Sequence, residues 1–225
     1  MTEERIVFTR EEQDKLNKMY EQWRINDHQR KRSAFHELNL MARMGGVVFA
    51  GDSITEMYPI SEMYLQNAHI YNRGISGITS NELLEHIDIH ILDMRPKQVF
   101  ILVGTNDLER GGTPETIAKN IREICVTCQR ECSDIEIYVL SIYPVNESSL
   151  FSDMVGKRTN KDICTANRLI AHTLSNVDSA HYVDLYASLL EDGQLNQRYT
   201  YDGLHLSIQG YRWVTDRLKT LVRHG

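Results

Sequence analysis

With 225 residues, 41% of them hydrophobic, the chain is long enough for one globular domain with a core and short for two. Its formal net charge of −6 argues against nucleic acid and anionic membranes as partners, because both attract basic faces. The N-terminus lacks the apolar run of a signal peptide, and no apolar run is long enough to span a membrane. We therefore expect a cytoplasmic protein without stable membrane insertion. Residues 1–225 are expected to form one domain, with residues 1–44 as a helical extension.

The chain then alternates between apolar runs and amphipathic segments. Residues 9–40 are polar with apolar positions at helical spacing, which predicts one or two surface helices, and Thr9 with Glu12 fits a capping box. After them we predict a strand at 47–50, a weaker strand at 68–72, a helix at 80–94 closed by Pro96, a strand at 99–103, a helix at 114–131, a strand at 135–142, a helix at 162–175, a strand at 181–185 and a helix at 207–223. Short apolar strands without polar alternation favour a parallel sheet covered on both faces.

Polar turns that contain glycine stand where ligands bind in such a fold, at the carboxyl ends of the strands. Three of them follow the first three predicted strands, and one precedes the last helix. They lie at residues 51–55, 72–77, 104–107 and 202–206. In this architecture these turns can meet at one rim of the sheet.

The side chains of these turns match the needs of acyl transfer, which are a nucleophile, a base, an orienting group and donors for the oxyanion. Ser53 can be the nucleophile on a strand-to-helix turn, and its own N–H can donate to the oxyanion. His205 can take the Ser53 proton and return it to the leaving group, while Asp202 fixes the tautomer of His205. The Gly77 N–H and the Asn106 side-chain amide can supply two further donors.

The four turns resemble the four sequence blocks of the SGNH/GDSL hydrolases, in the family's order. Gly51-Asp52-Ser53 resembles the first block, Gly77 and Asn106 match the glycine and asparagine of the next two, and Asp202-Gly203-Leu204-His205 resembles the last. Within the family, the chain most resembles the intracellular esterases similar to platelet-activating-factor acetylhydrolase. The resemblance implies an α/β fold, a three-layer α/β/α sandwich with a flavodoxin-like parallel sheet. It also implies ester hydrolysis without metal or cofactor, with Ser53, Gly77 and Asn106 holding the oxyanion.

Several site assignments keep an alternative. Gly74 is available as the second-block donor in place of Gly77, which we prefer because it ends the turn. Asp202 could cap the last helix instead of orienting its histidine. Asn106 and Asp107 could equally cap a turn or a helix, and we assign Asp107 no chemistry.

Other clusters of reactive side chains favour structural roles. Cys125, Cys128 and Cys132 lie near one helical face and fit a core stripe better than a zinc site, because no paired Cys or His motif follows. His86 and His90 lie four residues apart without the H-E-x-x-H pattern, so we expect a solvated helix face there.

The arginines Arg73 and Arg110 lie near the predicted rim, and we expect surface salt bridges rather than contacts to an anionic substrate. The segment 143–159 leaves a strand end and is polar and irregular, so we expect it to select the substrate.

The function that this pattern predicts is hydrolysis of a short-chain acyl or acetyl ester of a small molecule. A carbohydrate O-acetylesterase is the alternative among enzymes, and a non-catalytic binding module on the same fold is the alternative outside them. A nucleotide-binding protein is disfavoured because residues 51–55 contain neither G-x-G-x-x-G nor a P-loop lysine. The α/β-hydrolases are disfavoured because the chain lacks G-x-S-x-G. The N-terminal segment leaves a homodimer open.

Overall fold

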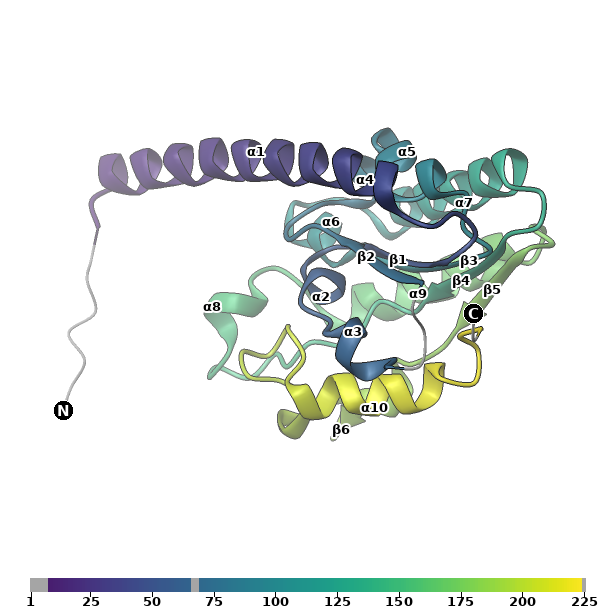
Figure 1. Cartoon of the computed structure of the whole chain (residues 1–225). Coiled ribbons are helices and arrows are strands. Elements are labelled where there is room, and N and C mark those ends of the chain that lie inside the picture. The colour runs from purple at the N-terminus through teal and green to yellow at the C-terminus, as the bar shows by residue number, and fades with distance from the viewer. Residues whose placement is uncertain (1–7, 66–68, 224–225) are drawn as a thin grey trace.

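A five-stranded parallel sheet lies at the centre of the computed structural model, which describes residues 8–65 and 69–223 (Figure 1). Its strands are β1 (Val47–Gly51), β2 (Ile70–Gly74), β3 (Gln98–Leu102), β4 (Glu136–Leu140) and β5 (Ala180–Val183). They are paired in the order β2-β1-β3-β4-β5, and every pair is parallel. This is the flavodoxin-like order, whose ligand site lies where the strand order reverses, between β1 and β3.

Helices cover both faces of the sheet, which confirms the predicted α/β/α sandwich (Figure 1). One face carries α1 (Arg10–Met41), α4 (Ser80–Glu85), α5 (Ile87–His90), α7 (Pro114–Glu131) and α9 (Asn160–Leu174). The other face carries α2 (Ser53–Glu56), α3 (Ile60–Met63) and α10 (Ile208–Leu218). The remaining elements are α6 (Thr105–Glu109), α8 (Ser152–Val155), the hairpin of β6 (Leu190–Glu191) with β7 (Gln194–Leu195), and 3-10 turns at Leu92–Met94, Ala187–Leu189 and Gln197–Tyr199.

Two hydrophobic cores hold these layers together, one on each face of the sheet. Alternate residues of a strand enter different cores, so Val48 faces the α7 side while Phe49 faces the α10 side. On the α10 side the Phe49 and Phe100 rings stack, with their centroids 4.7 Å apart, and the Tyr58 ring meets Phe49 edge-on at 5.6 Å. Because both faces are buried, the strands carry the continuous apolar runs seen in the sequence.

The predicted helix at 80–94 is wrong as a continuous helix, because the structure divides it into α4, α5 and a 3-10 turn. The backbone leaves helical geometry at His86 and again at Ile91. Near the second break, the Asn39 side chain of α1 donates to the Ile89 carbonyl at 2.8 Å and so occupies a backbone acceptor of the helix. The His90 side chain contacts the Arg73 carbonyl of β2 at 2.8 Å.

The last helix and the second strand also differ from their predicted bounds. The last helix ends at Leu218 rather than 223, because Gln98 binds the chain beyond it through the Leu221 carbonyl and the Arg223 N–H. The predicted strand at 68–72 is β2, displaced toward the C-terminus, and its residue Ala68 lies outside the described residues. The other predicted helices and strands are present within a few residues of their predicted ends.

Two polar side chains expected at the surface are buried. His90 is 1% exposed rather than on a solvated face, because the helix breaks let it turn toward β2. Arg73 is 5% exposed and pairs with no carboxylate within the described residues. Its Nε donates to Asn39 Oδ1 at 2.9 Å, and its guanidinium lies over the Phe35 ring at 5.0 Å. The helix α1 supplies both Asn39 and Phe35, so covering by α1 explains the burial of Arg73.

Helix α1 is a single helix of 32 residues that begins with the predicted capping box at Thr9. Its C-terminal half packs on α4 and α5, whereas its N-terminal half projects beyond the sheet region (Figure 1). The projecting part exposes four apolar side chains on one face: Leu16, Met19, Tyr20 and Trp23. The assignment of residues 1–225 to one domain, with 1–44 as its extension, stays a prediction. No helix within 8–65 or 69–223 has the length and apolar character that a bilayer crossing requires.

Candidate active site

The four glycine-containing turns of the sequence come together at the carboxyl edge of the sheet. Ser53 is the first residue of α2, directly after β1, and the carboxylate of Asp52 caps that helix by accepting the Ile54 N–H at 3.0 Å. The Leu102 carbonyl of β3 passes so close to Gly51 that a Cβ there would lie 2.0 Å from it. The turn that presents Ser53 is therefore built against β3 and leaves no room for a side chain at Gly51.

Ser53, His205 and Asp202 form one chain of hydrogen bonds. His205 Nε2 lies 2.9 Å from Ser53 Oγ, and His205 Nδ1 lies 2.7 Å from Asp202 Oδ2. A carboxylate at Nδ1 favours the tautomer with its proton on that nitrogen, which leaves the Nε2 lone pair facing the Ser53 hydroxyl. The arrangement can remove the hydroxyl proton as the oxygen attacks an acyl carbon.

The turn that carries His205 is fixed by its own side chains. The second oxygen of Asp202 accepts the N–H groups of Leu204 and His205, at 3.0 and 2.7 Å. Asp202 therefore holds its own turn and contacts the imidazole at once. It does not cap the last helix, which was its alternative role, because Ser207 is the N-cap of α10. Thr200 Oγ1 donates to the His205 carbonyl at 2.7 Å, and Gly203 (φ +84°) packs directly on Phe151.

Three groups beside Ser53 can donate to an oxyanion. Within the described residues, no acceptor pairs with the backbone N–H of Ser53 or of Gly77. One N–H of the Asn106 amide donates to the Ile78 carbonyl at 3.0 Å. The other N–H has no acceptor within the described residues. By contrast, the Gly74 N–H already donates to Asn72 Oδ1 at 2.9 Å. Gly77 also has a φ of +81°, which favours glycine there.

Arg158 was missed by reasoning from the sequence, although it contacts Asn106 directly. Its guanidinium donates from Nη2 to Asn106 Oδ1 at 3.1 Å, from Nε to the Thr105 carbonyl at 3.1 Å, and from Nη1 to Glu109 at 3.0 Å. Burial lowers the pKa of Arg158, which is 7% exposed, while Glu109 and Asp52 favour its charged form. The contact assigns the two ends of the Asn106 amide: Oδ1 faces the guanidinium, so Nδ2 faces the other way.

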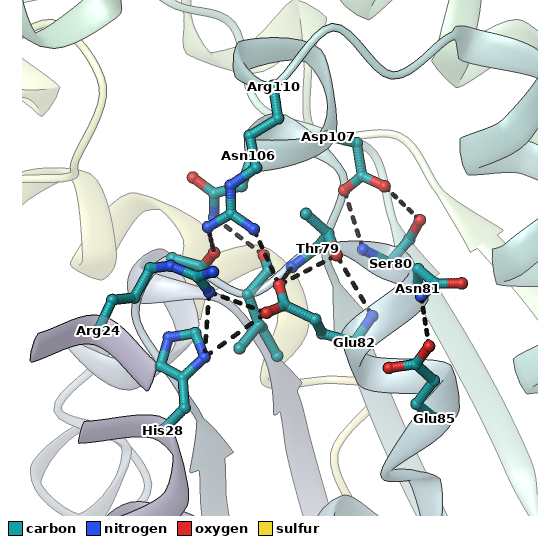
Figure 2. Close-up of polar contacts among 12 residues, drawn as sticks. Arg24, His28, Thr79, Ser80, Asn81, Glu82, Glu85, Asn106, Asp107 and Arg110 are labelled. Atoms are coloured by element: carbon teal, nitrogen blue, oxygen red, sulfur yellow. Dashed lines mark hydrogen bonds and ion pairs between the residues drawn. The ribbon is translucent and has the colours of Figure 1, made fainter. Parts of the chain in front are cut away.

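Two buried carboxyl groups lie close to the turn of Ser53. Burial raises the pKa of Asp52 to about 7, against the opposing effects of the Ile54 N–H and the Arg158 charge. Burial also raises the pKa of Asp107, whose two oxygens accept the Ser80 N–H and hydroxyl at 2.9 and 2.5 Å. Asp107 therefore binds the first turn of α4, in keeping with the capping role considered for it (Figure 2).

A group of charged side chains joins α1 to the turn of Gly77, as Figure 2 shows. Glu82 of α4 pairs with Arg24 of α1 at 2.8 Å and with Arg110 after α6 at 3.0 Å, which confirms the predicted salt bridge of Arg110. Although burial opposes it, hydrogen bonds from Arg24 and the Thr79 N–H, with the charge of Arg110, lower the pKa of Glu82 to about 2.

The cysteines of α7 fill the core as the sequence predicts. Cys125 and Cys128 are fully buried among the apolar side chains between α7 and the sheet, and Cys132 caps the helix end. All of the cysteine thiols are free. Within residues 8–65 and 69–223, no group of three or more His, Cys, Asp or Glu side chains is placed to hold a metal ion.

Comparisons with known proteins match the part of the chain that contains these residues. The model of the GDSL-like Lipase/Acylhydrolase family matches residues 49–213. A solved structure described as a platelet activating factor from Streptococcus pneumonia has 31% sequence identity and a TM-score of 0.89, covering 93% of this chain and 99% of that one. The resemblance to the platelet-activating-factor branch is thereby confirmed.

Curated relatives are more distant and longer. Platelet-activating factor acetylhydrolase IB subunit alpha1 from Bos taurus is 28% identical over 181 residues, which are 78% of this chain and 74% of the relative. N-acylneuraminate cytidylyltransferase from Escherichia coli is 28% identical over 203 residues, which are 89% of this chain. The chain spans only 43% of that cytidylyltransferase.

Proposed function

This chain belongs to the GDSL-like lipase/acylhydrolase family, and we propose that it is a serine esterase that hydrolyses short-chain acyl esters, acetyl esters included. The observation that carries the proposal is the continuous contact from Asp202 through His205 to Ser53, with distances of 2.7 and 2.9 Å. In the proposed reaction Ser53 Oγ bonds to the acyl carbon while His205 takes its proton. His205 then protonates the departing alcohol, and a water molecule releases the acid from Ser53 by the same steps in reverse order.

The oxyanion of this reaction would be held by the N–H groups of Ser53 and Gly77 and by the Asn106 amide. Free donors are the requirement for this role, because a donor that is already paired in the resting protein gives little to a developing charge. The Gly74 N–H is paired, whereas the Gly77 N–H has no acceptor in the described residues, which supports Gly77 as the donor of this turn.

The test is turnover of p-nitrophenyl acetate by the wild type and by Ser53→Ala, with Ser33→Ala as the matched control on the exposed face of α1. We expect Ser53→Ala to lower kcat at least about 10³-fold, because the covalent step loses its nucleophile, while Ser33→Ala keeps wild-type turnover. Circular dichroism should show that all three proteins are folded. Turnover that survives in Ser53→Ala would show that another residue is the nucleophile.

A carbohydrate O-acetylesterase is the second candidate, and the Escherichia coli relative favours it. Its name gives a substrate, N-acylneuraminate, which is a sugar acid whose acyl group is bound as an amide. Because 89% of this chain matches part of that protein, the relative supports a sugar as the alcohol part of the ester. Esters of increasing acyl length, compared with O-acetylated sugars, separate the two functions. Sugar acetates turned over faster than acetyl esters of simple alcohols would favour the second candidate. Faster turnover of short-chain acyl esters of simple alcohols than of sugar acetates would favour the first.

A further inference from the structure

Every proposed oxyanion donor belongs to an amide group whose carbonyl oxygen is itself hydrogen-bonded from behind. Such bonds polarise an amide and make its N–H a stronger donor, besides fixing the plane of the group. The three pairs are the Asp52 carbonyl with the Glu56 N–H at 2.9 Å, the Ser76 carbonyl with His28 Nε2 at 2.8 Å, and Asn106 Oδ1 with Arg158 Nη2 at 3.1 Å. The second pair brings a residue of α1, outside the four sequence blocks, to the peptide that carries the Gly77 N–H.

The groups that surround His28 define which of its two ring nitrogens carries a proton. The Ser76 carbonyl can only accept, so Nε2 must carry a proton. Arg24 Nη1 can only donate, and it lies 3.4 Å from Nδ1, which therefore presents its lone pair (Figure 2). His28 is 2% exposed, and burial lowers its pKa, in keeping with a neutral ring.

Contacts from α1 and α6 hold both peptide groups that flank Gly77. The Ser76–Gly77 peptide is held through His28, and the Gly77–Ile78 peptide through Arg110, whose Nη2 donates to the Gly77 carbonyl at 2.6 Å. Glu82 pairs with the arginines on both sides of the turn (Figure 2). The direction of the Gly77 N–H is thus set by side chains that approach from two different helices.

We propose that His28 is a positioning residue of this site: its Nε2–H fixes and polarises the Ser76–Gly77 peptide, and so strengthens the Gly77 N–H as an oxyanion donor. The proposal rests on the function proposed above, since it needs an oxyanion to form beside Ser53. A donor that acts only on the developing charge stabilises the transition state more than the bound ester. Loss of the His28 contact therefore lowers kcat and leaves KM nearly unchanged.

The experiment compares two substitutions that separate the N–H donor of His28 from its ring. His28→Phe keeps a ring in the buried site but removes the N–H, whereas His28→Gln keeps an N–H donor and removes the ring. We expect His28→Phe to lower kcat for p-nitrophenyl acetate about 10- to 100-fold with KM within about threefold. This is less than the loss of about 10²- to 10³-fold for removing one oxyanion donor, because the Gly77 N–H is weakened and not removed. His28→Gln should recover most of the wild-type kcat. His36→Ala, on the exposed face of α1, is the control and should match the wild type.

The outcomes separate this proposal from the one on which it rests. Rates are measured at least 15 °C below the unfolding midpoint of each variant, and His28→Ala repeats the loss of the N–H in a smaller side chain. Equal kcat in wild type and His28→Phe would overturn the positioning role. Equal losses in the Phe and Gln variants would overturn it too, because the N–H would then be irrelevant. A wild type without turnover would instead remove the proposed function, before any variant is compared.

Discussion

The carboxyl group of Asp52 is buried directly beside Ser53, and this burial makes the stability of the fold depend on pH. Asp52 is 1% exposed, and its pKa is raised from 3.8 to about 7. Between these two values the folded protein holds a proton on Asp52 that the unfolded chain releases. The free energy of unfolding therefore falls as pH rises through this window and receives no further change from Asp52 above about pH 7.

Asp52→Asn should remove this pH dependence while keeping an oxygen that accepts the Ile54 N–H. We expect the unfolding free energy of the variant, relative to wild type, to increase from pH 4 to pH 7 by up to about 4 kcal/mol and then to level off. Urea unfolding at four pH values measures the difference, with Asp178→Asn, at an exposed turn, as control. A difference that is the same at every pH would show that Asp52 is charged throughout.

At the scale of single residues, the sequence predicted the side chains that belong to local patterns. Ser53, Asp202 and His205 stand in short blocks at fixed spacing, and the structure places them within hydrogen-bond distance of one another. Their catalytic roles stay predictions. His28 and Arg158 could not be predicted, because each reaches the site from a distant segment and no spacing in the chain marks such a contact.

The segment at 143–159 shows what polarity alone fails to predict at the scale of an element. It was expected to be an irregular, substrate-selecting loop, yet Tyr143 and Val145 are buried in the two cores. Asn146 donates to the Leu195 carbonyl at 2.9 Å, and Arg158 anchors the other end beside Asn106. The longest exposed run of the segment is its middle, 147–154, so a loop exchange that tests substrate selection should be confined to it.

Arg158→Met should test whether this segment supports the site through Asn106. Methionine keeps an unbranched side chain but has no N–H groups, so the Asn106 amide loses the contact that assigns its two ends. We expect kcat for p-nitrophenyl acetate to fall about 10- to 100-fold, less than the loss of about 10²- to 10³-fold for removing one oxyanion donor, because the Asn106 amide itself remains.

Arg168→Met, at an exposed position of α9, is the control for this variant. Both proteins are measured well below their unfolding midpoints, because removing a buried guanidinium also leaves Glu109 without its partner. A kcat equal to that of wild type in Arg158→Met would contradict the supporting role.

The division of the predicted helix at 80–94 has a similar origin. The apolar period correctly predicted that Leu83, Ile87 and Ile91 face the core. It could not predict the breaks between them, because Asn39, which donates to the Ile89 carbonyl, comes from a distant segment of the chain. A period in the sequence describes one face of a helix, and says nothing of the partners that compete for its backbone.

At the scale of the whole molecule, stability resides in the two cores, and the outer half of α1 contributes little. Trp23 is 60% exposed, and its ring stacks on that of Tyr20, on the same helix. We expect Trp23→Ala to change the free energy of unfolding by no more than about 0.5 kcal/mol. Phe100→Ala, which empties a site 1% exposed, should cost about 3–5 kcal/mol.

Urea unfolding followed by circular dichroism compares the two variants at several protein concentrations. A large, concentration-dependent loss in Trp23→Ala would indicate that a second copy covers this face. A homodimer stays a prediction until such a measurement is made. The alternation of strands and helices predicted the fold class well. The projection of α1 could not be predicted, because a polar helix has the same sequence pattern whether it packs on the domain or projects from it.

The separation of Ser53 from His205, 152 residues apart in the chain, has a consequence for the newly made protein. A ribosome adding about 5–20 residues per second needs roughly 8–30 s between these two residues. During that time the nascent chain gains Gly77 and Asn106 beside the proposed nucleophile, but it lacks the proposed base, and so it stays inert toward cellular esters. The proposed esterase activity therefore begins when the turn at residues 200–206 docks against Ser53.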